Sequence, residues 1–161
     1  MGASNATADR SRDRCLDRRR PIVKAVVDTN VVAYLLLGTE RFVEEARAFI
    51  SLLDEGWAPA LWEAELANAL WMATRHKILS LEDAAKRLML AEGLGIHAVP
   101  NRTLWQAALV RAHQSNVAVY DTLFVELAAR ERLPLVTFDR ALLRVFPDIA
   151  ARPSNAMTRR P

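Results

Sequence analysis

Short apolar runs alternate with longer helical stretches along this chain, and this alternation limits the folds that it can adopt. The predicted strands are residues 22–27, 57–60, 96–99 and 135–137, with one edge strand after residue 147. The predicted helices are residues 31–37, ended by Gly38, 41–53, closing at Gly56, 61–75, 80 to 93 or 95, 101–113, 119–132 and 139–145. The first strand is β-branched and wholly apolar apart from Lys24, as expected for a buried strand. The pattern therefore predicts an α/β protein, a three-layer α/β/α sandwich with a mostly parallel central sheet.

The positive charge of the chain lies at its ends. The 161 residues carry a net charge of +3, and residues 1–20 hold six arginines against three aspartates. Residues 21–151 are slightly acidic. We predict a disordered basic extension at 1–20, one folded domain at 21–151 and a loose tail at 152–161. A solvated arm is the simplest interpretation of the extension, and a non-specific contact with nucleic acid is the alternative.

Several protein classes are excluded by simple counts. The single cysteine, Cys15, cannot form a disulfide scaffold. The longest apolar run, residues 31–37, is seven residues long, whereas about 20 are needed to cross a bilayer. No segment has the pattern of a secretory signal. We expect a soluble cytoplasmic protein that does not contact a membrane.

Two aspartates directly follow predicted strands. Asp28 comes after the apolar strand 22–27, and Asp139 follows the last clear strand. If the strands are parallel, both carboxylates emerge at the same edge of the sheet, where α/β proteins place their chemistry. Each aspartate is also well placed to cap the helix that follows it, so capping is the structural alternative.

Two further acids are predicted on the inner faces of helices. At about 100° per residue, Glu65 falls inside the apolar arc of helix 61–75, between Leu61 and Ala69. Asp121 points inward from the first turn of helix 119–132, whose solvent side is marked by Glu126 and Arg130. An ion pair would also explain Glu65, and a favourable interaction with the helix dipole would explain Asp121.

Gathered at one place, these four carboxylates would need a compensating cation. Two carboxylates 5 Å apart repel by about 3 kcal/mol at an effective dielectric of 20. The set contains only oxygen donors, with no nearby cysteine or histidine cluster, which favours Mg²⁺ or Mn²⁺ over Zn²⁺. An acidic magnesium pocket most naturally acts on phosphate esters. His76, His97 and His113 are given no role.

The same residues resemble a known family. The chain around Asp28-Thr29-Asn30, the helix segment 62–70 around Glu65, the helix start 120–124 and the segment 136–139 are similar to the PIN domain. More narrowly, they resemble the VapC-type toxin ribonucleases of toxin–antitoxin pairs, over about residues 22–150. The 20-residue extension is longer than usual for such toxins, and the tail after residue 151 departs from the pattern.

The resemblance implies a catalytic metal site and a set of partners. By residue, it implies that Asp28, Glu65, Asp121 and Asp139 are the catalytic, metal-binding acids. It further implies accessory polar roles for Thr29, Asn30, Asn68 and Thr137. The implied activity is Mg²⁺- or Mn²⁺-dependent endonucleolytic cleavage of RNA, with a cognate antitoxin and a homodimer as assembly partners.

Other functions fit parts of the same pattern. A non-catalytic PIN-like module that binds RNA or protein, and a structure-specific DNA nuclease, are the alternatives. An aspartate-nucleophile phosphatase is disfavoured, because position 30 is Asn30 rather than a second acid. Most aromatic residues are expected in the core, and an exposed subset could receive an antitoxin helix. The aromatic residues considered are Phe42, Phe49, Trp57, Trp62 and Trp71.

Overall fold

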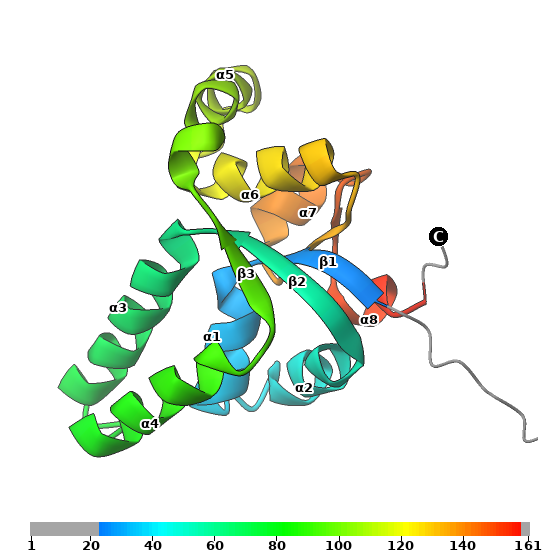
Figure 1. Cartoon of the computed structure of the whole chain (residues 1–161). Coiled ribbons are helices and arrows are strands. Elements are labelled where there is room, and N and C mark those ends of the chain that lie inside the picture. Colours follow the sequence, from blue (N-terminus) through cyan, green and yellow to red (C-terminus); the bar gives the residue numbers. More distant parts are fainter. Residues whose placement is uncertain (1–22, 159–161) are drawn as a thin grey trace, which may run out of the picture.

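The computed structural model describes residues 23–158, in which the strands form one parallel sheet. The strands are β1 (Val23–Val27), β2 (Leu53–Pro59), β3 (Ile96–Val99), β4 (Leu135–Val136) and β5 (Ala150–Ala151). Their order across the sheet is β3-β2-β1-β4-β5, and every pair of neighbours is parallel (Figure 1). The predicted extension at 1–20 lies outside the described residues.

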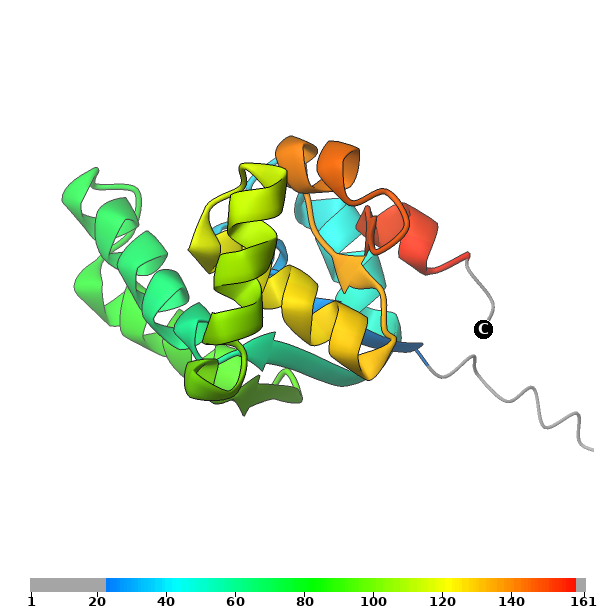
Figure 2. The same cartoon turned by 90° about the horizontal axis from the view of Figure 1, so that it is seen from above.

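Helices cover both faces of this sheet. They are α1 (Thr29–Leu37), α2 (Val43–Leu52), α3 (Leu61–Arg75), α4 (Leu81–Glu92), α5 (Trp105–Ser115), α6 (Val119–Glu131), α7 (Arg140–Val145) and α8 (Pro153–Ala156). Helices α1 and α2 lie on one face, and α5, α6 and α7 lie on the other (Figure 1). Seen from above, α3 and α4 project at one end of the molecule, and α8 lies beside α2 at the other (Figure 2). The predicted three-layer sandwich is confirmed. No helix among residues 23–158 is both long and apolar enough to span a bilayer.

The centre of the sheet is the pairing of β1 with β4. Ala25, Val26 and Val27 are all buried, as a strand covered on both faces requires. Val27 is in register with Val136, and the Asp28 amide donates to the Val136 carbonyl at 3.0 Å. The chain segments that leave β1 and β4 therefore start side by side at the carboxyl edge.

The second predicted helix is wrong at its end. It was expected to run to residue 53 and to close at Gly56, whereas α2 ends at Leu52 and Leu53 already begins β2. Gly56 is buried inside β2, where a Cβ atom would come within 3.0 Å of Ile96 Cγ1 and 3.1 Å of Leu53 Cδ2. The glycine therefore allows a close approach to β3 instead of ending a helix.

Two other segments differ from their predictions. The helix predicted at 101–113 divides into a 3₁₀ turn, Asn101–Thr103, and α5. The Asn101 side chain accepts a hydrogen bond from the Leu61 amide at 3.1 Å, which ties this turn to the start of α3. The tail expected to be loose after residue 151 contains α8, in which Pro153 and Ala156 are buried. Proline at the first helical position favours this helix start.

Glu126 does not mark the solvent side of α6. Its exposure is only 9%, because Arg111 of the neighbouring helix α5 binds it at 2.9 Å. The predicted pair with Arg130 is present at 3.2 Å. A partner from another helix thus turns an expected surface acid into a buried, doubly paired one.

Candidate active site

Asp28 lies at the junction of β1 and α1, where it caps the helix with one carboxylate oxygen and binds neighbouring polar side chains with the other. It caps α1, and its Oδ1 accepts a hydrogen bond from the Asn30 amide at 3.2 Å. Its Oδ2 accepts from Asn30 Nδ2 at 2.8 Å and from Thr137 Oγ1 at 2.6 Å. Capping and membership of an acidic cluster are therefore compatible at this residue.

Asn30 and Thr137 connect the ends of β1 and β4. Asn30 Nδ2 donates to Thr137 Oγ1 at 3.1 Å, while Asn30 Oδ1 accepts from the Phe138 amide at 3.1 Å. Thr137 Oγ1 also accepts from the Asp139 amide at 2.9 Å. Both residues were predicted as accessory polar positions, and the structure puts them between the two aspartates.

Asp139 caps α7 as well. Its Oδ1 accepts hydrogen bonds from the amides of Ala141 at 2.6 Å and Leu142 at 3.0 Å. Among the hydrogen bonds of residues 23–158, none engages its Oδ2. The second oxygen is therefore available to a ligand.

Glu65 lies at the border of the buried stripe of α3. That stripe consists of Trp62, Leu66, Leu70 and Ala73. Glu65 is half-buried rather than inside the stripe, and Met72, which helical periodicity puts in the same arc, is 39% exposed. Thr29 Oγ1 donates to Glu65 Oε2 at 2.5 Å, so the predicted accessory Thr29 holds the carboxylate.

Asp121 and Asn68 differ in their relation to the cluster. Asp121, in the first turn of α6, is half-buried and close enough to the other acids to feel their charge. Asn68 is exposed on α3, one turn beyond Glu65, and no hydrogen bond of residues 23–158 joins it to the acids. Hydrogen bonds therefore link Asp28, Asn30, Thr137 and Asp139 in one group, and Thr29 and Glu65 in another. In the described part of the chain, Asp121 is related to them only through its charge.

Burial and neighbouring charges raise the pKa values of Asp28, Glu65 and Asp121. The pKa of Asp28 is raised to about 7, first by burial of the carboxylate and further by the charges of Glu65 and Asp121. Burial also raises the pKa of Glu65, with a contribution from Asp121. Burial and the charge of Asp139 raise the pKa of Asp121. None of the ion pairs formed within residues 23–158 involves these four acids, so no cation of the described chain balances them.

The donor chemistry of this cluster fits a hard divalent cation. Four carboxylates with hydroxyl and amide neighbours provide only oxygen ligands, as Mg²⁺ and Mn²⁺ prefer. Even so, no three His, Cys, Asp or Glu side chains in the described part of the chain are close enough together to form a ready-made metal site. The acids therefore fit a cation in charge and donor type, although they do not form a ready-made site for one.

An aromatic cluster beside the acids was not predicted. The Phe138 ring lies between Thr137 and Asp139 in sequence and packs on Phe42, with ring centres 4.7 Å apart. Phe42 in turn stacks on Tyr34 at 4.6 Å. The only sequence signal was an aromatic residue placed directly between two polar site positions.

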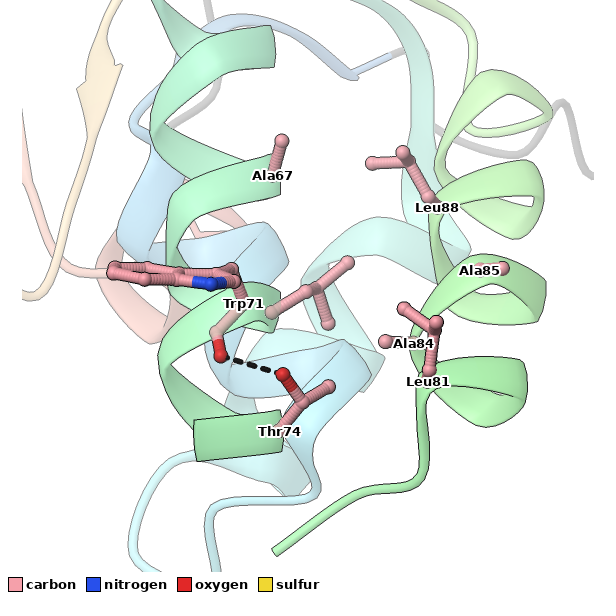
Figure 3. A pocket seen from close by; sticks show the side chains of 8 residues that line it. Ala67, Trp71, Thr74, Leu81, Ala84, Ala85 and Leu88 are labelled. Carbon is pink, nitrogen blue, oxygen red and sulfur yellow. Dashed lines mark hydrogen bonds between the residues drawn. The ribbon is translucent and has the colours of Figure 1, made fainter. Parts of the chain in front are cut away.

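Helices α3 and α4 form a separate apolar groove. Its volume is about 220 Å³, and Figure 3 shows Trp71 and Leu88 on its two sides. Phe49 and Trp62 are buried as expected of core aromatics, whereas Trp71 is 50% exposed. This groove begins at Ala67, on the part of α3 that follows Glu65. The residues that line it are Ala67, Leu70, Trp71, Thr74, Leu81, Ala84, Ala85 and Leu88.

Known proteins share both this sequence pattern and this fold. The family model described as PIN domain matches residues 25–146. A curated relative, Ribonuclease VapC3 of Pyrobaculum aerophilum, is 31% identical over 129 residues, which are 78% of this chain and 96% of the relative.

A solved structure has a similar arrangement of helices and strands. It is the crystal structure of VapBC2 from Rickettsia felis bound to a DNA fragment from their promoter. The match has a TM-score of 0.57 at 14% identity and covers 80% of this chain and 98% of the matched one. At that identity, the likeness concerns the fold alone.

Proposed function

Because this chain belongs to the PIN domain family, we propose that it is a Mg²⁺- or Mn²⁺-dependent endoribonuclease and the toxin of a toxin–antitoxin pair. One observation carries the proposal: four half-buried acids, from the β1–α1 junction, α3, α6 and the β4–α7 turn, interact through their charges, and three of them have raised pKa values without a balancing cation in residues 23–158. The identity to Ribonuclease VapC3 supports RNA as the substrate.

The proposed metal ligands are Asp28, Asp121 and Asp139, with Glu65 beside them. A bound divalent cation supplies a more acidic water and neutralises charge that develops on the phosphate oxygens. Neutralisation by a cation would return the raised pKa values of Asp28, Glu65 and Asp121 towards their ordinary range.

The remaining polar residues would orient the acids. Asn30 and Thr137 hold Asp28 Oδ2, and Thr29 holds Glu65 Oε2. The same two residues, Asn30 and Thr137, fix the backbone of Phe138 and Asp139. Such pre-orientation lowers the cost of aligning an RNA phosphodiester for attack by water and departure of the 3′ oxygen.

The proposed partners follow from the same relatives. The Rickettsia felis protein is a VapBC complex, which supports a cognate antitoxin for this chain. The apolar groove of α3 and α4, with its half-exposed Trp71, offers a surface for an antitoxin helix. We also propose a homodimer and a soluble, cytoplasmic location.

A non-catalytic binding module is the second candidate. The specific observation in its favour is that no three acidic, histidine or cysteine side chains of residues 23–158 already form a metal site. A module of this kind would bind RNA or protein and would gain no thermal stability from Mg²⁺ or Mn²⁺.

RNA cleavage with matched variants tests the proposal. Wild type, Asp28→Asn and Asp148→Asn are assayed on RNA and on DNA, each with Mg²⁺, with Mn²⁺ and with chelator. Asp148 is exposed, and its variant controls for the loss of one aspartate. We expect metal-dependent cleavage of RNA by wild type and Asp148→Asn, and a loss of about 100-fold or more in Asp28→Asn.

The other outcomes separate the alternatives. Equal cleavage by wild type and Asp28→Asn would refute the assigned acids. Binding of RNA without cleavage under any metal condition would favour the non-catalytic module. Cleavage confined to DNA would favour the structure-specific DNA nuclease.

A further inference from the structure

Arg152 joins the end of the sheet to α2. It follows β5 directly, and its Nε and Nη2 donate to Glu45 Oε1 at 3.2 Å and Oε2 at 2.5 Å. The Ser154 amide adds a third hydrogen bond to Glu45 Oε1 at 3.0 Å. Paired donation of this kind fixes the orientation of the guanidinium plane as well as its position.

The ionisation of Glu45 supports a persistent contact. Hydrogen bonding to Arg152 lowers the pKa of Glu45 to about 2. The carboxylate therefore stays charged throughout the neutral range. The contact between Arg152 and Glu45 joins the start of α8 to α2, and the two helices lie side by side in Figure 2.

The same guanidinium also contacts an aromatic ring near the acidic cluster. Its central carbon lies 5.2 Å from the centre of the Phe138 ring, within the range of a cation–π interaction. The ring is in contact with Phe42 at 4.7 Å and with Tyr34 at 5.6 Å between centres. The Phe138 ring is thus in contact with Arg152, which precedes α8, and with Tyr34 of α1 and Phe42 at the start of α2.

Phe138 connects this contact to the site. It stands between Thr137 and Asp139, and its amide donates to Asn30 Oδ1. A shift of the ring would move the turn that carries Asp139 and the two residues that hold Asp28. Displacements of about 1 Å at a catalytic group can cost about 100-fold in rate, so a residue that fixes this turn affects the reaction.

We infer that Arg152 is a positioning residue for the acidic site, acting through the ring of Phe138. The expected effect of Arg152 on catalysis rests on the proposed nuclease function. Its effect on the position of the β4–α7 turn does not. Arg152 lies beyond residue 146, where the family match ends, and sequence patterns predicted only a loose tail there. The segment directly after β5 therefore helps to position the acidic site in this chain.

Amide chemical shifts test the positional claim without metal or RNA. In ¹H–¹⁵N spectra, Arg152→Gln should shift the amides of Phe138 and Asp139, because their hydrogen bonds to Asn30 and Thr137 change. Arg47→Gln is the matched control, since Arg47 forms an exposed pair with Glu44 on the same helix at 3.7 Å. The control should leave both amides unchanged, and amides of α4 serve as a remote reference in every variant.

Metal affinity and kinetics test the catalytic consequence. We expect Arg152→Gln to weaken Mn²⁺ binding and to lower kcat for RNA by about tenfold, the lower end of the range for an outer support of a metal ligand. The KM for RNA should stay unchanged, and Arg152→Lys should be intermediate because it keeps the charge without the planar donor pair. In a Phe138→Leu background, Arg152→Gln should add little, since the connection is already lost.

Each failure has a distinct meaning. Unchanged Phe138 and Asp139 amides in Arg152→Gln, or changes equal to those of Arg47→Gln, would overturn the inference. If Arg152→Gln does not fold, Glu45→Gln and Arg152→Lys are judged by the same shifts. If wild type neither binds Mn²⁺ nor cuts RNA, the proposed function fails, and the amide shifts still decide whether Arg152 positions the turn.

Discussion

Thr137 is the most connected side chain of the candidate site. It is fully buried, donates to Asp28 Oδ2 and accepts from both Asn30 and the Asp139 amide. A hydroxyl can serve one donor and two acceptor bonds, and Thr137 uses all three. Because the residue is also fully buried, its position requires threonine or a substitute of similar size that keeps the hydroxyl.

Thr137→Val therefore removes three hydrogen bonds at almost constant volume. We expect a loss of about 1–3 kcal/mol in the free energy of unfolding, because Asn30 and the Asp139 amide lose their partner. Thr137→Ser should recover much of this loss. Urea denaturation measures the effect, with the exposed Thr103→Val as a control. A Thr137→Val protein as stable as wild type would contradict the assigned hydrogen bonds.

The pKa of Asp28 leads to a prediction about pH. An acid with an ordinary pKa of 3.8 in the unfolded chain and about 7 in the folded one binds its proton more tightly when folded. Proton binding by Asp28 therefore stabilises the folded state. This contribution to the free energy of unfolding is complete below about pH 4 and is lost as the pH rises towards 7 and beyond. The raised pKa values of Glu65 and Asp121 act in the same direction.

We therefore expect the Tm of the metal-free protein to fall between pH 5 and pH 8. Asp28→Asn should make this dependence flatter, and Mn²⁺ should restore the Tm of wild type at pH 8 more than at pH 5. Thermal unfolding followed by circular dichroism measures all three. A Tm that rises over this range in wild type would show that the cluster is not a source of electrostatic strain.

At the scale of the element, sequence patterns placed some side chains better than others. Asp28 and Asp139 were predictable because parallel strands bring their carboxyl ends to one edge, whatever the details of packing. Glu65 was predicted inside the buried stripe of α3 and lies at its border. Helical periodicity gives the direction of each side chain but does not show which directions are covered by other parts of the fold. Glu126 was misassigned because its partner Arg111 comes from another helix, which no local pattern reveals.

Glycine was ambiguous in the same way. Gly38 ends α1 as predicted, with a φ of 69° in the left-handed region. Gly56 was expected to close a helix in the same way, yet it lies inside β2 and allows the close contact with β3. The difference depends on the neighbouring strand, which is distant in sequence.

A substitution at Gly56 tests this interpretation of β2. Gly56→Val should destabilise the protein by about 1–3 kcal/mol, because the new side chain collides with Ile96 and Leu53 in a packed core. Gly93→Ala is the control, since the nearest atom to its Cβ would be the Leu90 carbonyl oxygen at an ordinary 3.5 Å. Urea denaturation of both variants measures the difference. Equal stabilities would indicate that β2 and β3 are not so closely packed.

At the scale of the molecule, the fold gathers acids that are far apart in sequence. The order of the strands puts β1 beside β4, α3 follows β2 on one side, and α6 begins near the same edge. Each acid alone has an ordinary structural explanation, and Asp28 and Asp139 do cap helices. Those explanations leave out the raised pKa values of Asp28, Glu65 and Asp121, which a bound cation would bring down.

A crystal of the protein soaked in Mn²⁺ tests this central claim most directly. The account predicts an anomalous scattering peak among Asp28, Glu65, Asp121 and Asp139, with the carboxylates closer together than in the metal-free protein. The same soak of Asp28→Asn should give a weaker peak or none. Crystals of wild type in which these carboxylates stay apart with no manganese between them, or in which each is neutralised by a guanidinium group, would contradict the account.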